Sequence, residues 1–478
     1  MKRVIKWVFN KIKLTSNISI YFFLALIIWT SISCSKEQKT EIILANSKQA
    51  TIIINDSFLS GSWTITPSVS PDVFPVEIEN GETSKVTFIT DMDSVSYEIG
   101  LGTIKDFYVL LNKKDSALTR IEGVSPKVNF TEEYIMKNKG KWSVEVIEAQ
   151  ELIQIISVIT PMGLSDTKSM IINHDSTDYY RSVLKQFLPF KNEPIVDKID
   201  SLLKENWYIN LKADACALEF DTQNKLKKSA IYDRMRGSQN LLNPYLDMLN
   251  DFAQKSNFRT FFADNKPFYD SLIQAHENEM PTKKQWEWLE TQFPDHSYDN
   301  YRITFSPLVK GNHSTVRFNN NGFKQAIMFI RPPYRIKNVS KAVSNGLITR
   351  MVFTEIDHNY VNPETDKYIN EINPIFSDRV KWTAGKESVG YNAPYTIFNE
   401  YMTWSVYLLY CYDHYSPEDF EVINDRIVNY MMERRGFQRF DDFHSTLLSL
   451  YSNRKAGTTI ADLYKPLLEC ARDYNLKM

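Results

Sequence analysis

The spacing of apolar side chains changes about 150 residues into the chain. Before that point, from Thr51 to Leu111, short runs alternate apolar and polar residues, and turn-forming pairs such as Asn80-Gly81 separate the runs. This pattern predicts a small β-sandwich-like domain over residues 50–130. After it, apolar residues recur at i, i+3 and i+4, which predicts helices over 179–187, 195–203, 241–252 and 268–276. The sequence therefore predicts an α+β protein.

A short β-like interval interrupts the helical pattern. Its three apolar runs cover 301–305, 314–318 and 326–330, after which prolines end the last run. The helical pattern then continues, and Ser416 followed by Pro417 predicts a helix that begins with Ser416 as its N-cap. We expect residues 151–478 to form a mostly helical domain with a small β-sheet, and residues 131–150 to form a linker.

The N-terminus has the layout of a secretory signal peptide. A basic segment precedes an apolar run from Ile18 to Trp29, and Ser31-Ile-Ser33 then leads to Cys34. A cysteine in this position resembles the lipobox of bacterial lipoproteins, and Cys34-Ser-Lys-Glu37 resembles a signal for export to the cell surface. We therefore expect residues 1–33 to be removed, Cys34 to be lipidated and residues 34–49 to form a tether. The expected location is the bacterial outer membrane, with the protein lipid-anchored and facing the exterior.

The amino-acid composition limits which classes of binding partner are expected. Without the first 33 residues, 51 basic residues stand against 58 acidic ones, a net charge of −7. No basic stripe interleaved with aromatics occurs, so nucleic acid is not an expected partner. Besides Cys34 the chain has three cysteines, without C-x-x-C spacing, which predicts buried free thiols rather than a disulfide framework. The many aromatic side chains are sufficient to build large cores and to line a groove.

The main candidate chemistry lies in residues 351–363, which read MVFTEIDHNYVNP. TEIDH matches the metalloprotease motif H-E-x-x-H except that Thr354 replaces the first histidine. In that motif the two histidines bind zinc and the glutamate activates a metal-bound water. Here Thr354 and His358 occupy the ligand positions and Glu355 occupies the base position. A threonine hydroxyl is a poor zinc ligand at neutral pH.

This segment is expected to be a helix that ends at Asn362-Pro363. At roughly 100° per residue, Glu355 and His358 point into an otherwise apolar arc of the helix. Only Arg350 and Asp357 share a stripe that suits solvent. A carboxylate held in the apolar arc needs a partner, a metal or a raised pKa.

Glu400 is the best candidate partner for His358 or for a bound metal. It is the only acidic residue within an apolar and aromatic helical stretch that begins near Pro394. Gluzincins take their third zinc ligand from a glutamate on a later helix, and Glu400 suits that position. The alternative is a buried Glu–His pair without metal, which the sequence favours because Thr354 stands at the first ligand position.

The remaining histidines offer weaker candidates. His414 is expected to cap the end of its helix, and His444 to lie on a solvated helical turn. The others are expected at the surface: His174, His276, His296 and His313.

Over roughly residues 150–478 the chain resembles a bacterial family catalogued as domain of unknown function 4932. The matching stretches are Leu249-Asn-Asp-Phe252, Ser256-Asn-Phe258-Arg-Thr-Phe261-Phe262, Phe268-Tyr269, Ser306-Pro-Leu308 and His358-Asn-Tyr-Val-Asn362-Pro363. That family is regarded as zinc metallopeptidases with H-E-F-S-H followed by a similar N-P. The resemblance implies a zincin-like fold, with Glu355 as catalytic acid/base and His358 as the second zinc ligand. Thr354 departs from the family pattern at the first ligand.

Two functions are therefore expected as alternatives. The first is a surface-anchored, gluzincin-like metallopeptidase that hydrolyses peptides or polypeptides with a zinc-activated water. The second is a catalytically inactive homologue that uses the same cleft, together with the β-domain, to bind peptides or glycans. Zinc is the cofactor of the first alternative only.

Overall fold

The computed structural model describes residues 41–55, 57–65, 71–79, 81–165, 171–174, 177–385, 388, 390–391 and 393–476. The predicted signal peptide and the predicted lipidation site, Cys34, lie outside these residues. From Ile43 onward the chain forms one compact unit.

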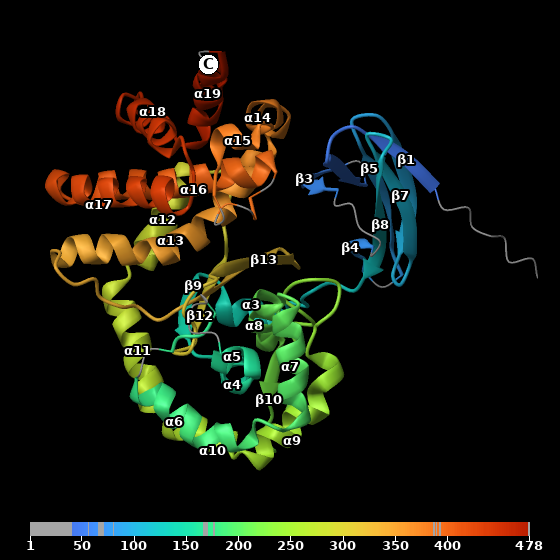
Figure 1. Cartoon of the computed structure of the whole chain (residues 1–478), viewed down its shortest axis with the longest axis vertical. Coiled ribbons are helices and arrows are strands. Elements are labelled where there is room, and N and C mark those ends of the chain that lie inside the picture. Colours follow the sequence, from blue (N-terminus) through green and yellow to red (C-terminus); the bar gives the residue numbers. More distant parts are fainter. Residues whose placement is uncertain are drawn as a thin grey trace, which may run out of the picture. The chain divides into compact units, whose positions relative to one another are not determined.

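The N-terminal region consists of two four-stranded sheets, with strand orders β1-β7-β8-β4 and β3-β2-β5-β6 (Figure 1). Side chains from both sheets, among them Phe88 and Phe107, form one hydrophobic core. The predicted N-terminal sheets are confirmed, and the first strand begins within the predicted tether. The strands are β1 (Glu41–Ala45), β2 (Gln49–Ile54), β3 (Ser57–Thr64), β4 (Asp72–Glu77), β5 (Thr83–Ile89), β6 (Ser94–Gly100), β7 (Ile104–Leu111) and β8 (Asp115–Val124).

The segment 131–150, which the sequence predicts to be a linker, contains regular structure. Helix α3 (Glu132–Asn138) begins at Thr131, whose side chain accepts a hydrogen bond from Tyr134 N. Strand β9 (Lys141–Glu145) follows and pairs in parallel with β12. Trp142 and Val144 alternate with polar residues in this strand, a period of two that the linker prediction overlooked.

The second region contains the four-stranded sheet β13-β14-β12-β9, in which β13 is an edge strand. The three strands predicted from the sequence are confirmed as β12 (Asn300–Phe305), β13 (Ser314–Asn320) and β14 (Phe323–Ile330). Strand β14 is parallel to β12 and antiparallel to β13. Its residues are almost all buried because it is an inner strand covered on both faces.

Between β9 and β12 the chain forms mainly helices. Three predicted helices fall within α6, α7 and α11. The fourth begins later than predicted, at Leu246, after a 3₁₀ turn that contains Pro244. Before the TEIDH segment the elements are α4 (Glu148–Ile159), α5 (Pro161–Ser165), α6 (Asp178–Phe187), η1 (Leu188–Phe190), α7 (Pro194–Lys204), α8 (Tyr208–Asp214), η2 (Ala215–Ala217), β10 (Leu218–Phe220), β11 (Leu226–Lys228), η3 (Asn243–Tyr245), α9 (Leu246–Lys255), α10 (Phe258–Asp264), α11 (Lys266–Glu279) and α12 (Thr282–Gln292).

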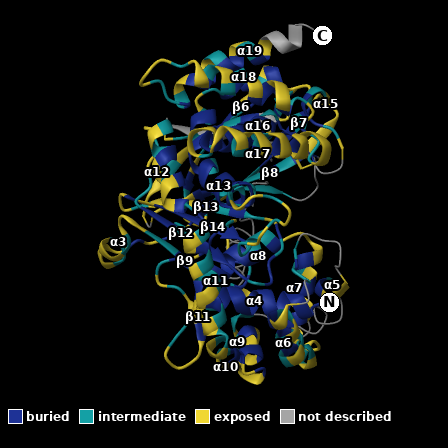
Figure 2. Cartoon of the chain, turned by 90° about the vertical axis from the view of Figure 1, so that its left-hand side faces the viewer, coloured by how far each residue is buried: buried dark blue, intermediate teal, exposed yellow. Residues whose placement is uncertain are grey.

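Two long helices, α13 and α16, form the centre of the C-terminal part and pack against each other (Figure 1). Every residue of α16 from Ile397 to Cys411 is buried, and buried residues also dominate α13 (Figure 2). The predicted N-cap Ser416 is confirmed, since its side chain accepts a hydrogen bond from Asp419 N. The elements here are α13 (Lys341–Asp366), α14 (Ile369–Phe376), α15 (Arg379–Trp382), α16 (Pro394–His414), α17 (Pro417–Asn429), the π-helical turn η4 (Tyr430–Arg434), α18 (Phe440–Ser452), η5 (Ala461–Leu463) and α19 (Tyr464–Leu476).

Candidate functional site

The TEIDH segment lies on α13, which begins at Ser340 and continues past the predicted end. Pro363 lies inside the helix, so the prediction that Asn362-Pro363 ends it is wrong. A proline has no N–H to donate to the carbonyl four residues earlier, here that of Asn359. The Tyr298 hydroxyl donates to the Asn359 carbonyl instead, at 3.1 Å. This substitute hydrogen bond satisfies the carbonyl that Pro363 leaves without its helical donor.

Thr354 directs its hydroxyl to its own helix. The side chain is buried, and its Oγ1 donates to the Arg350 carbonyl at 3.0 Å. A threonine in a helix often forms this bond to the carbonyl four residues earlier. The proton of the hydroxyl is therefore held by the backbone at the position where the motif requires a metal-binding imidazole.

The structure brings His358 and Glu400 together, as the sequence predicts. Nε2 of His358 lies 3.8 Å from Oε1 of Glu400, across the contact between α13 and α16. Nδ1 of His358 lies 3.1 Å from the side-chain oxygen of Asn362, one turn later on α13. If Nδ1 carries the proton for that bond, Nε2 is left to face Glu400.

The other carboxylate oxygen of Glu400 is occupied by an arginine. Oε2 accepts from Arg435 Nη1 at 2.7 Å and from the indole nitrogen of Trp404 at 3.1 Å. Burial alone would raise the pKa of Glu400, but the charges of Arg435 and His358 outweigh that effect and lower it. Glu400 is thus a buried anion with a cationic partner.

Glu355 and Asp357 lack a comparable partner. Burial raises the pKa of Glu355, while the charges of His358 and Lys212 act in the opposite direction. Asp357, which the sequence predicts to face solvent, is fully buried. Neither of its carboxylate oxygens has a hydrogen-bond partner among the described residues, and burial holds its pKa well above the usual value. At this level of α13 the partly exposed residues are Glu355 and His358, so the side of the helix that carries Asp357 does not face solvent.

The donor set around His358 does not fit a zincin zinc site. Such a site needs three protein ligands, and here one imidazole nitrogen and one carboxylate oxygen face a common space. The third position is Thr354, and the Arg435 charge lies against Glu400. Among the residues that the structure describes, no group of three His, Cys, Asp or Glu side chains could hold a metal ion.

Arg435 and Trp404 are the members of this site that the sequence analysis missed. Trp404 lies four residues after Glu400 on α16, so helical spacing could have indicated it. Arg435 follows a π-helical turn far along the chain, and no spacing rule connects it to Glu400. Its neighbour Arg434 is exposed, and the sequence does not distinguish the two.

The other histidines differ from expectation in part. His276 and His444 are buried rather than exposed, and burial lowers the pKa of His276 to about 4 and that of His444 to about 3. His414 is confirmed at its helix end, with Nδ1 2.8 Å from the Tyr410 carbonyl oxygen. The predicted buried free thiols are confirmed at Cys216 and Cys411.

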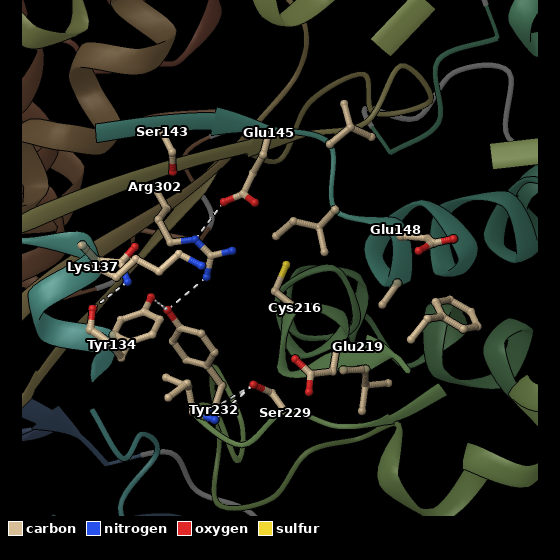
Figure 3. A pocket seen from close by; sticks show the side chains of 17 residues that line it. Tyr134, Lys137, Ser143, Glu145, Glu148, Cys216, Glu219, Ser229, Tyr232 and Arg302 are labelled. Atoms are coloured by element: carbon tan, nitrogen blue, oxygen red, sulfur yellow. Dashed lines mark hydrogen bonds and ion pairs between the residues drawn. The ribbon is translucent and has the colours of Figure 1, made fainter. Parts of the chain in front are cut away.

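A separate polar cavity of about 690 Å³ lies beside β9 and β12 (Figure 3). Its main cation, Arg302, donates to Glu145 at 2.8 Å and to the Tyr232 hydroxyl at 3.0 Å. That hydroxyl also lies 2.6 Å from the hydroxyl of Tyr134. The polar groups in this part of the wall already form hydrogen bonds with one another. They therefore need a ligand less than the polar groups around Glu355 do.

Comparisons with known proteins found no similar protein. No family model, no curated protein and no solved structure matches the chain. Within the described residues, no helix has the length and apolar character needed to cross a membrane.

Proposed function

We propose that this chain is a lipid-anchored surface protein whose zincin-like cleft binds peptides without hydrolysing them. The observation that carries the proposal is the Glu400–Arg435 ion pair, at 2.7 Å. An arginine at this position neutralises the carboxylate that a gluzincin would offer to zinc. Together with the bond from Thr354 to its own backbone, it leaves His358 without a complete ligand set.

The zincin-like fold is part of the proposal. It rests on the order in the chain of the four-stranded sheet, of helix α13, which carries TEIDH, and of helix α16, which carries Glu400. It rests also on the resemblance to the family catalogued as domain of unknown function 4932. The N-terminal sheets, which share one core as in a β-sandwich, would extend the binding surface or act as a spacer.

The active peptidase is the alternative function. Glu355 retains one property that such an enzyme needs, because burial raises its pKa toward the range of a general base. In that alternative His358 and Glu400 would be the residues that hold the metal, the metal would supply an activated water, and Glu355 would be the general base.

Anchoring is proposed from the sequence alone. A lipid on Cys34 would hold the protein on the outer membrane, with the cleft facing the exterior. Labelling with a radioactive fatty acid tests this, with Cys34→Ala as the control. Label on the wild type but not on the variant supports the anchor, and equal label on both contradicts it.

The peptide-binding proposal is tested with fluorescein-labelled tryptic peptides of serum albumin. Polarisation should show binding that a chelator does not change, and mass spectrometry should show the peptides intact. Chelator-sensitive cleavage would overturn the proposal in favour of the peptidase. Neither binding nor cleavage would overturn both functions.

A further inference from the structure

Four buried or half-buried cations near Glu355 lack an acidic partner. This cation cluster consists of Lys212, Arg236, Arg331 and Arg350. Among the described residues, none of the four forms an ion pair with a carboxylate. An unpaired charge away from water is costly to maintain, and burial lowers the pKa of Lys212 to about 7, so the three arginines are the charges that require an explanation.

Two members of the cation cluster are held on the backbone at the start of β13. The Lys212 ammonium donates to the Asn312 carbonyl at 2.5 Å, and Arg236 Nη1 donates to the Thr315 carbonyl at 3.3 Å. The Thr315 hydroxyl lies 3.4 Å from the side-chain oxygen of Asn359 on α13. These contacts place both cations between β13 and the helix that carries Glu355.

The other two members lie over aromatic rings. The guanidinium carbon of Arg350 is 4.1 Å from the ring centre of Trp404, and that of Arg331 is 4.3 Å from the ring centre of Tyr334. Arg350 is one turn before Thr354 on α13. Stacking fixes the plane of a guanidinium while leaving its N–H groups free to bind a carboxylate.

His313 lies near three of the four cations. Burial, followed by the charges of Lys212, Arg350 and Arg331, lowers its pKa to about 3. It is therefore neutral at pH 7, and its Nε2 is buried with no hydrogen-bond partner among the described residues. Lys212 and Arg236 in turn act on Glu355. Three of the cations thus surround His313, two act on Glu355, and Glu355 and Asp357 are the neighbouring acids without an ion pair among the described residues, since Glu400 already pairs with Arg435.

We propose that the cation cluster binds acidic stretches of polypeptide, with ligand carboxylates paired to the half-buried Arg350 and Arg236. This inference rests on the proposed peptide-binding function and adds the chemical class of the ligand. A peptide is favoured over other anions because β13 is an edge strand beside the cluster. An extended peptide can pair with an edge strand while its side chains reach the neighbouring groups.

The test compares fluorescein-labelled octaglutamate, octaglutamine and octalysine by polarisation, with the mature protein. Octaglutamate should bind at least about tenfold more tightly than octaglutamine, and octalysine should not bind. Raising NaCl from about 0.05 to about 0.5 M should weaken octaglutamate binding. Equal binding of octaglutamate and octaglutamine, with albumin peptides still bound, would overturn the acidic preference alone. Loss of all peptide binding would overturn the proposed function.

Variants locate the site. Arg350→Gln should weaken octaglutamate binding by about tenfold or more, whereas Arg350→Lys, which keeps the charge, should retain most of it. Arg426→Gln removes an exposed arginine of α17 and should change nothing. Unaltered binding in Arg350→Gln would overturn the assignment. If that variant does not fold, Arg236→Gln is measured in its place, with the same expected loss.

A polyuronate is the competing anion. If polygalacturonate binds more tightly than octaglutamate and displaces it, the ligand is an acidic glycan and the peptide assignment is wrong. If polygalacturonate fails to displace octaglutamate, the assignment is supported.

Discussion

The N-terminal sheets and the helical region have different interiors. Among the described residues of the sheets, the buried polar side chains are Thr90 and Thr119, and all other buried positions are apolar. The helical region buries the carboxyl groups of Glu151, Asp357 and Glu400, together with several cations. The sheets are therefore held mainly by apolar packing, whereas the helical region keeps charges out of water.

Within the helical region, Glu400 and Glu151 show two ways in which a buried carboxyl group is stabilised. Glu400 pairs with Arg435 and has a lowered pKa. Glu151 accepts a hydrogen bond from the Tyr179 hydroxyl at 2.6 Å, has no cation beside it, and has a pKa raised to about 7, mainly by burial. Glu400 stays charged, whereas Glu151 holds its proton up to a pH of about 7. We expect a ligand in the region of the buried charged groups, which are Glu400 and the cation cluster.

The largest effect is expected from breaking the Glu400 pair. Arg435→Ala should lower the free energy of unfolding by about 3–5 kcal/mol, because it leaves a buried carboxylate uncompensated. Urea unfolding measures the loss. The neighbouring exposed arginine supplies the control, since Arg434→Ala should cost less than about 0.5 kcal/mol. Similar losses in the two variants would show that the pair does not stabilise the fold.

A smaller effect is expected at Glu151, and it should depend on pH. The folded state keeps the proton of Glu151 up to a pH of about 7, against 4.5 for an ordinary glutamate. This contribution to stability is complete below pH 4.5 and is lost as the pH rises through about 7. Between pH of about 5 and about 8, wild type should lose roughly 3 kcal/mol relative to Glu151→Gln.

Thermal unfolding at several pH values measures this loss. Glu421→Gln, at an exposed position of α17, should follow the wild-type curve. Parallel curves for wild type and Glu151→Gln would contradict the assignment of the proton.

Restoring the H-E-x-x-H motif should raise the zinc affinity by about one order of magnitude. Thr354→His places imidazoles four residues apart on α13, and its zinc affinity should exceed that of wild type at least about tenfold. Competition with a chromophoric chelator measures the affinity, and Thr354→Ala is the control. If Thr354→His binds zinc no better than Thr354→Ala, the two positions do not share a ligand space.

The smallest effect is expected in the sheets. Asp106 and Arg120 form an ion pair on neighbouring strands, with Nε 2.7 Å from Oδ1. Both side chains remain about one-third exposed, so solvent screens the attraction. Asp106→Asn should lower the free energy of unfolding by no more than about 1 kcal/mol. A loss as large as that of Arg435→Ala would remove the contrast between the two regions.

The sequence predicts the parts of this structure that depend on local periodicity. The strand runs and the N-cap Ser416 follow from side-chain spacing, and the meeting of His358 with Glu400 follows from the position of Glu400 as the only acid in an apolar helical stretch. The sequence predicts Asp357 at the surface because the sequence of one helix does not show which other elements pack against it. The passage of α13 through Pro363 depends on Tyr298, and the charge state of Glu400 depends on Arg435. Both partners are distant in the chain, so only the folded structure identifies them.

The most direct test of the account is the zinc content of the wild-type protein. The mature chain is saturated with zinc, dialysed and measured by mass spectrometry for bound metal, beside His358→Ala. The account predicts well below one zinc per chain in both proteins, because Thr354 and the Arg435-bound Glu400 do not complete the ligand set. One zinc per chain in wild type, lost in His358→Ala, would contradict it.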